Sequence, residues 1–144
     1  MEQYIGYGFS IDDLTDSNWL ELLQKDKDAY AALQRDCLDE FGNGDTDSLR
    51  SFARDWLDIR YENAGDYLAA VINNGEKEAA GADDIVCCYD TYLIFESIRF
   101  TDDSKRALYI RNEADFIKMI GRYIPTDGLR FGSVWGGGDE CWID

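Results

Sequence analysis

The hydrophobic pattern changes period near the middle of the chain, and this change limits the possible folds more than any other feature of the sequence. Between residues 18 and 73, apolar residues recur every three to four positions, which is the spacing of amphipathic helices. Between residues 85 and 111 the chain is instead dense in β-branched and aromatic residues, which is typical of strands. The sequence therefore predicts an α+β fold, in which a helical N-terminal half packs with a small antiparallel sheet.

The first half predicts one strand and three helices. In QYIGYGFSI the alternation places Ile5, Tyr7, Phe9 and Ile11 on the face that meets the core. Asn18 and Glu21 have the spacing of a capping box, which predicts a helix from here to Phe41, with an interruption of its stripe at residues 25–28. The expected stripe is Trp19, Leu22, Leu23, Tyr30, Leu33, Cys37 and Phe41. Helices near residues 48–62 and 64–73 follow, with Leu49, Phe52, Trp56, Ile59, Tyr67, Leu68, Val71 and Ile72 buried.

The second half predicts two hairpins separated by a helix. NNGEKEAAGADD is expected to be a polar loop, IVCCYDTYLIFESIRF a strand, TDDSK a turn and RALYIR the return strand. Asn112 should cap a helix that ends at Pro125-Thr-Asp-Gly128. LRFGSVW and CWID suit a closing hairpin around GGGDE, with Trp135 and Trp142 expected in the core. The predicted order is β-ααα-ββ-α-ββ in one domain, residues 1–144.

The charge is strongly negative and limits the choice of partner. The chain has 30 Asp and Glu against 14 Lys and Arg, a net charge of −16. Such a charge makes nucleic acid or an anionic membrane an improbable direct partner and a basic protein the natural one. Residues 1–66 hold 16 acids and 6 cations (net −10), whereas residues 67–144 hold 14 and 8 (net −6). The sequence predicts that the N-terminal half is the more negative face.

The four cysteines indicate no disulfide framework or zinc site. Cys37, Cys87, Cys88 and Cys141 include no CxxC pair, and a bond between neighbouring Cys87 and Cys88 on a strand would be strained. With no signal peptide and no 18-residue apolar run, a reducing cytoplasmic location is expected. The cysteines are interpreted as buried free thiols.

A calcium loop is suggested by three residues and excluded by two others. Asn43, Asp45 and Asp47 occupy the first, third and fifth positions of a possible EF-hand loop. Ser48 stands where the loop needs Gly, and Arg54 where it needs a bidentate Glu. The segment is therefore interpreted as a loop and helix cap, and no metal or cofactor is expected.

Catalytic motifs are missing from the sequence. There is no histidine, which removes the commonest general base and the usual Ser or Cys triads. WGGGDECW lacks the Lys-Ser/Thr of a Walker loop and the following helix of a dinucleotide site, so it is interpreted as a hairpin turn. The chain is not expected to be an enzyme, and no catalytic residue is assigned; a small hydrolase that uses paired carboxylates is the remaining enzymatic alternative.

Acidic residues gather on the helix faces opposite the apolar stripes. With Trp19 at 0°, the acids Glu21, Asp28 and Asp39 fall at about 180–200°, with Asp36 nearby. On the next helix, Asp55, Asp58 and Glu62 lie at i, i+3 and i+7. The predicted partner-binding residues are Glu21, Asp28, Asp36, Asp39, Asp55, Asp58 and Glu62. They would form one extended negative surface able to occupy a groove that binds phosphates; the alternative is a solvated face that only keeps the chain soluble.

In size, acidity, lack of histidine and absence of a catalytic signature, the chain resembles the phage and mobile-element inhibitors of bacterial defence, the anti-CRISPR and anti-restriction proteins. The resemblance is one of overall character across the whole chain. It implies a cytoplasmic, non-enzymatic DNA mimic that blocks a CRISPR effector nuclease or a restriction enzyme. An immunity protein or antitoxin that neutralises a basic nuclease toxin is the runner-up, since that class is also small, acidic and cytoplasmic.

Overall fold

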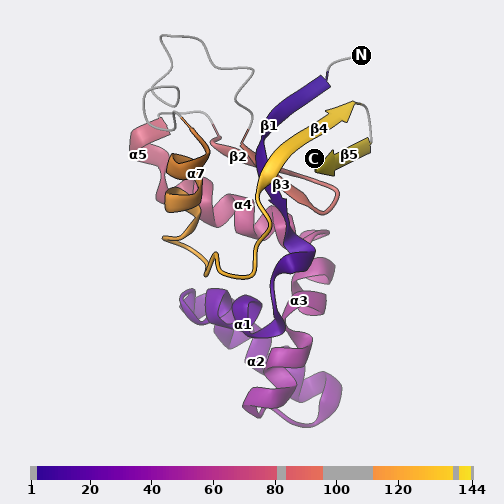
Figure 1. Ribbon diagram of the computed structural model, residues 1–144. Helices are drawn as coiled ribbons and strands as arrows, with labels where there is room; N and C mark the ends of the chain where they lie inside the picture. Colours follow the sequence, from indigo (N-terminus) through magenta and orange to yellow (C-terminus); the bar gives the residue numbers. More distant parts are fainter. Residues whose placement is uncertain (1–2, 81–83, 96–111, 138–139, 144) are drawn as a thin grey trace. The chain divides into compact units, whose positions relative to one another are not determined.

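The computed structural model describes residues 3–80, 84–95, 112–137 and 140–143 and has the predicted α+β architecture (Figure 1). The helices are a 3-10 turn at Ile11–Asp13, α1 (Asp16–Gln24), α2 (Lys27–Phe41), α3 (Thr46–Tyr61), α4 (Ala64–Gly75), α5 (Lys77–Ala80) and α7 (Glu113–Ile120). The strands are β1 (Gln3–Ser10), β2 (Val86–Tyr89), β3 (Tyr92–Phe95), β4 (Gly132–Gly137) and β5 (Glu140–Ile143).

The contacts within the chain divide it into two compact units. The helical unit comprises residues 14–64 and contains α1, α2 and α3. The sheet unit comprises residues 1–13 and 65–144 and contains the strands, α5, α7 and nearly all of α4. Each unit buries its own set of large apolar side chains, such as Trp19 and Leu33 in the first and Phe9 and Phe116 in the second.

In its described residues, the sheet unit is built on a five-stranded antiparallel sheet with the order β2-β3-β1-β4-β5. The N-terminal strand β1 is central and pairs with β3 through Tyr7↔Phe95 and with β4 through Tyr7↔Ser133. Phe9 is buried, as the alternation predicts. The closing hairpin is confirmed: β4 pairs with β5, and Trp135 lies opposite Trp142 in the register.

Aromatic rings join the sheet to α7. Phe116 of α7 lies 5.9 Å from Phe95 and 6.0 Å from Phe131, and Phe131 lies 5.4 Å from Phe9 (ring centroids). Such edge and tilted ring pairs stabilise a core beyond their area burial. The predicted cap of α7 is confirmed, because the Asn112 side chain accepts a hydrogen bond from the backbone N–H of Asp115. The helix ends at Ile120, with Gly121 as its C-cap, before the proline that was expected to stop it.

The structure corrects the predicted loop and hairpin between residues 73 and 111. NNGEKEAAGADD was predicted to be a polar loop, but α4 continues to Gly75 and α5 covers Lys77–Ala80. The long predicted strand from residue 85 is two strands, which turn at Asp90 and Thr91; Asp90 adopts a left-handed conformation with φ 57°. A turn whose first residue has positive φ reverses the chain in two residues. The predicted TDDSK turn and the RALYIR strand lie outside the described residues.

The helical unit begins with a capping box one turn earlier than predicted. The Thr15 hydroxyl accepts from the N–H of Asn18, and the Asn18 side chain accepts from the N–H of Thr15. Asn18 is therefore the third helical residue and not the cap, and Glu21 takes no part. The predicted continuous helix is also two helices, because the chain leaves α1 at Lys25 and Asp26 caps α2 through the N–H of Ala29.

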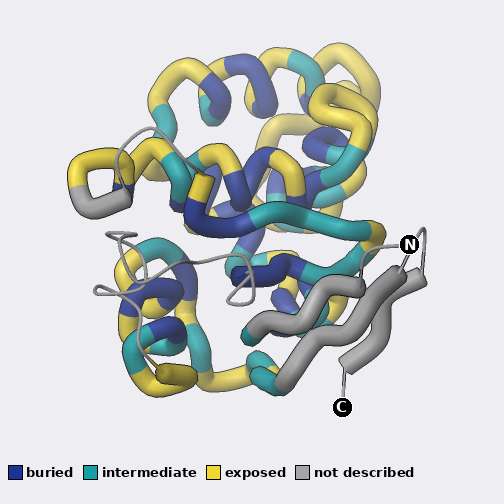
Figure 2. The backbone as a smooth tube through the Cα atoms, turned by 90° about the horizontal axis from the view of Figure 1, so that it is seen from above, coloured by how far each residue is buried: buried dark blue, intermediate teal, exposed yellow. Residues whose placement is uncertain are grey.

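Two residues expected in the core are exposed. Phe41 is 57% exposed and Ile59 is 80% exposed. The buried side chains of α3 are Leu49, Ala53, Trp56 and Leu57, so this helix is rotated towards Ala53 and Leu57 and away from Ile59. Figure 2 shows the resulting alternation of buried and exposed turns along the helices.

Candidate functional site

All seven predicted partner-binding acids belong to the helical unit, but they do not have the same role. Asp36 is half-buried, and its carboxylate accepts a hydrogen bond of 2.7 Å from the indole nitrogen of Trp56. It also lies 3.6 Å from the guanidinium of Arg35. Because this carboxylate joins α2 to a core tryptophan of α3, Asp36 is a structural residue.

Asp58 also has a structural role. Its carboxylate accepts a 2.8 Å hydrogen bond from the N–H of Ala64, the first residue of α4, and lies 3.8 Å from Arg54. The first N–H groups of a helix have no partner within the helix, so a carboxylate there stabilises the helix start. The Asp58 side chain is still 41% exposed, but this bond gives it a structural role.

Glu62 does not lie on the helix face to which it was assigned. The helix α3 ends at Tyr61, and Glu62 is its C-cap with φ 67° and ψ −36°. A residue with a Cβ in this region carries strain of roughly 1–3 kcal/mol. Its side chain is exposed, but it departs from the i, i+3, i+7 line of Asp55 and Asp58.

Four of the seven acids remain exposed without a structural role among the described residues: Glu21, Asp28, Asp39 and Asp55. The predicted line through Glu21, Asp28 and Asp39 is broken by the helix end at Lys25. Asp28 and Asp39 remain on one face of α2, about 16 Å apart along its axis. The acidic surface is therefore smaller and more scattered than the sequence predicted.

The charge is spread over both units. The helical unit (residues 14–64) has 12 acids and 6 cations, a net −6, and the sheet unit has 18 and 8, a net −10. Divided by their 51 and 93 residues, the two densities are nearly equal. The excess of the N-terminal half in the sequence arises because that half also contains four acids of the sheet unit, Glu2, Asp12, Asp13 and Asp66.

The helical unit contains a hollow that sequence reasoning missed. It lies between the end of α2 and the first three turns of α3, has a volume of about 450 Å³ and will be called the aromatic hollow. Its lining is Phe41, Asn43, Asp45, Asp47, Ser48, Ser51, Phe52 and Asp55. Phe41 and Phe52 meet edge to face at 5.0 Å, and Phe41 leaves much of its ring open to solvent. Phe41 was predicted to lie in the core because it continues the apolar stripe of α2.

The carboxylates around the aromatic hollow have different neighbours. Asp45 caps α3 by accepting from the N–H of Ser48 at 2.8 Å, and this bond holds the pKa of Asp45 below its usual value. Asp47 pairs with Arg50 at 2.9 Å. Asp55 is exposed on the next turns of α3. The loop that resembles a calcium site is thus a cap and turn, as interpreted from the sequence.

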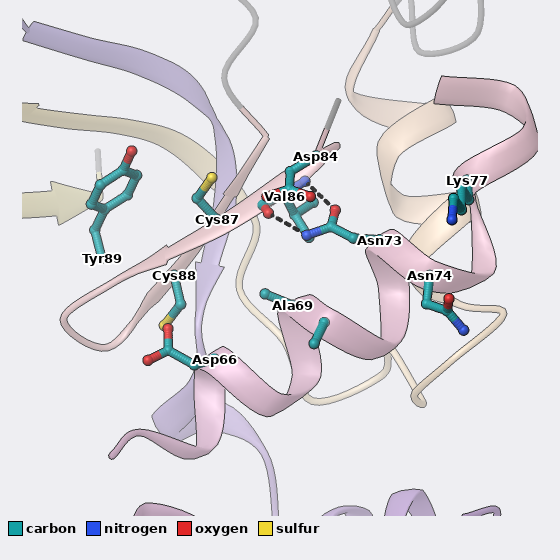
Figure 3. Close-up of a pocket in the computed structure, with 11 residues that line it drawn as sticks. Asp66, Ala69, Asn73, Asn74, Lys77, Asp84, Val86, Cys87, Cys88 and Tyr89 are labelled. Atoms are coloured by element: carbon teal, nitrogen blue, oxygen red, sulfur yellow. Dashed lines mark hydrogen bonds between the residues drawn. The ribbon is translucent and has the colours of Figure 1, made fainter. Parts of the chain in front are cut away.

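A second hollow, of about 640 Å³, lies in the sheet unit between α4 and strand β2 (Figure 3). The Asn73 side chain crosses from α4 to the strand, where it donates to the carbonyl of Val86 at 2.9 Å and accepts from the N–H groups of Ile85 and Val86 at 2.7 and 2.9 Å. Cys87 and Cys88 lie on opposite sides of the strand and are half-buried. Cys37, in the helical unit, is the buried free thiol that was expected.

Among the described residues of the sheet unit, one carboxylate is buried. Glu76 is 6% exposed, accepts a 2.8 Å hydrogen bond from the Tyr123 hydroxyl and pairs with Arg122. A buried carboxylate needs such partners to remain charged. Gly75, beside it, has no room for a side chain because a Cβ there would overlap the Tyr123 ring. This cluster holds α4 against the chain that follows α7 and is structural.

The described residues contain no group of three or more Cys, Asp or Glu side chains placed to hold a metal ion. None of the helices in the described part of the chain combines the length and apolarity needed to cross a membrane. The chain was compared with family models, curated proteins and solved structures, and no match was found.

Proposed function

We propose that the protein is a non-enzymatic inhibitor that binds a basic nucleic-acid-binding protein, a CRISPR effector nuclease or a restriction enzyme, in the cytoplasm of a bacterial host cell. The acidic face of the helical unit occupies the groove that the nuclease keeps for nucleic acid. The observation that supports this proposal best is that Asp28, Asp39 and Asp55 are exposed carboxylates with no structural role among the described residues.

The physical basis is imitation of phosphates. The 16 Å between Asp28 and Asp39 along α2 corresponds to about five phosphate steps along one DNA strand. A net charge of −16 attracts a basic groove over a distance and speeds encounter, whereas close contacts set how long the complex lasts. The protein and nucleic acid should therefore compete for the same groove of the nuclease.

The test is a charge reversal with a control of equal charge. Asp28, Asp39 and Asp55 are changed together to Lys, which alters the net charge from −16 to −10. The control changes Glu78, Glu113 and Asp127 to Lys; these are exposed acids of the sheet unit, and the net charge again becomes −10. Asp28 and Glu113 both lie in the first turn of a helix, so the two variants also share a small cost from the helix dipole.

Binding is measured against a panel of purified CRISPR effector nucleases, restriction enzymes and nuclease toxins, with and without DNA, at about 50 and 500 mM salt. The expected result is that DNA competes, that the first variant loses binding and that the control retains it. If the protein bound a nuclease toxin and no other member of the panel, the immunity-protein alternative would be favoured. Equal binding by both variants would contradict recognition through the helical unit.

The hydrolase alternative is tested separately. A carboxylate-dependent enzyme would place its acids in a cleft, and the hollow beside β2 contains Asp66 and Asp84. A substrate screen with the Asp66→Asn and Asp84→Asn variants decides this point: turnover by the parent protein that one of these variants loses, with the fold intact, would favour the enzyme.

A further inference from the structure

The aromatic hollow combines an open aromatic ring with a negatively charged border. Phe41 is 57% exposed at the end of α2, and the neighbouring Leu38 on the same helix is 55% exposed. Exposed rings next to a hollow are the usual anchors of protein interfaces, since burying them on binding supplies much of the affinity. No cation is among the residues that line the hollow.

We propose that the aromatic hollow is the docking site for an arginine side chain of the basic partner. The guanidinium lies over the ring of Phe41 and against the carboxylate of Asp55, while Asp45 and Asp47 close the border. The proposal rests on the proposed function in one respect, which is that the partner presents a basic surface.

The charges favour a cation even after the opposing effects are counted. The start of α3 contributes a positive charge of about one half from its dipole. Asp47 is balanced by Arg50. Asp45 and Asp55 still provide two negative charges against this half charge, and Asp55 lies in the third turn of α3, beyond the reach of the dipole at the helix start.

Arginine fits this site better than lysine. Its planar guanidinium can stack on an aromatic face and donate to a carboxylate at the same time, and it gives up its hydration shell more easily than an ammonium group. The helical unit already contains two guanidinium–aromatic contacts. Arg54 lies 5.9 Å from the centroid of the Trp19 ring, and Arg60 lies 5.1 Å from that of the Trp56 ring.

The probe is the peptide acetyl-Gly-Arg-Gly-Arg-Gly-amide, added to the full ¹⁵N-labelled chain and followed by amide chemical shifts. The control peptide replaces each arginine by citrulline, which has nearly the same shape but no charge. The expected result is a saturable shift of amides between Phe41 and Asp55 with the arginine peptide only. Equal shifts with the citrulline peptide, or shifts spread evenly over all exposed acids, would overturn the proposal.

Variants assign the contacts. Phe41→Leu keeps an apolar side chain but removes the ring, and it should raise the Kd about two- to fivefold, the range for an exposed cation–π contact. Asp55→Asn should also raise the Kd, whereas Glu21→Gln makes the same charge change on α1 and should leave it unchanged. An unchanged Kd for Phe41→Leu, with the rest of its spectrum native, would contradict docking over the ring.

The outcomes for this proposal and for the proposed function are separable. Docking of the arginine peptide without binding to any nuclease of the panel would support the hollow and overturn the proposed function. Binding to a nuclease that is lost with the Asp28, Asp39 and Asp55 reversal but is unchanged by Phe41→Leu would overturn the hollow and leave the proposed function standing.

Discussion

Asp55 and Asp58 lie about one turn apart on α3. The structure predicts that removing the Asp58 carboxylate lowers the free energy of unfolding, whereas removing the Asp55 carboxylate changes it little. The Asp58 carboxylate bonds the first N–H of α4 and lies near Arg54, whereas Asp55 is exposed without such a bond. We therefore compare Asp58→Ala with Asp55→Ala.

The magnitude for Asp58→Ala follows from its two contacts. Loss of a hydrogen bond from a helix start to a charged side chain costs about 1–2 kcal/mol. The ion pair with Arg54 is 3.8 Å long and partly exposed, so it adds only about 0.3–0.5 kcal/mol. The sum is about 1.5–2.5 kcal/mol, or roughly 4–8 °C in Tm for a chain of this size.

Asp55→Ala should change the free energy of unfolding by less than about 0.5 kcal/mol, and Ala is the better helix former. Both variants are measured by urea unfolding, followed by tryptophan fluorescence and far-UV circular dichroism. Asp58→Asn keeps an oxygen acceptor, so it should lose less than Asp58→Ala. If the free energies of unfolding of Asp58→Ala and Asp55→Ala agreed within about 0.5 kcal/mol, the division of the acids into those with and those without a structural role would be wrong.

Four further predictions follow from other parts of the structure. Asn73→Ala removes three hydrogen bonds to Ile85 and Val86 and should cost about 2–3 kcal/mol in urea unfolding, and Asn73→Leu, which keeps a branched side chain without polar atoms, should not restore it. Tyr123→Phe removes a donor from the buried carboxylate of Glu76 and should cost about 1.5–3 kcal/mol in urea unfolding. Glu62→Gly relieves the positive φ and should raise the free energy of unfolding by about 0.5–1 kcal/mol, measured in the same way. Burial first, and the Asp45 charge second, raise the pKa of the Cys37 thiol above its ordinary value. Its contribution to stability is therefore complete at pH values below that ordinary pKa and falls as the pH rises through the folded pKa. Alkylation followed by mass spectrometry should modify Cys87 and Cys88 before Cys37.

Local features were predictable from the sequence. The Asn112 cap needs only a side chain and an N–H three residues later, so four residues contain the whole signal. The helix start at Thr15 was missed because Thr15 with Asn18 and Asn18 with Glu21 have the same spacing. The earlier cap satisfies two backbone N–H groups and adds three residues to the helix.

The exposed residues were harder to predict because the exposure of a side chain depends on which other element packs against that face of its helix. On α3, Leu49 and Trp56 fit either of two apolar stripes, one through Phe52 and Ile59 and one through Ala53 and Leu57. Packing selects the second, and the sequence does not show the packing partner. Phe41 continues the stripe of α2, but at the last residue of the helix no side chain covers the ring fully.

The distances between the exposed acids limit how much their charges contribute to stability and to binding affinity. Two carboxylates 16 Å apart in water repel by only about 0.3 kcal/mol, and at physiological salt, with a screening length of about 8 Å, by only about a seventh of that. The repulsion between Asp28 and Asp39 therefore lowers the free energy of unfolding by almost nothing. For this reason, the presence of the two acids does not by itself indicate that they were retained for binding at the expense of stability. The same screening limits what these charges give a complex until a partner removes the water between them. Affinity must then come from groups that a partner buries, and in the helical unit the open ring of Phe41, with Asp55 beside the same hollow, provides them. For this reason Phe41→Leu, which leaves the net charge at −16, is a more decisive test of recognition than any further change of charge.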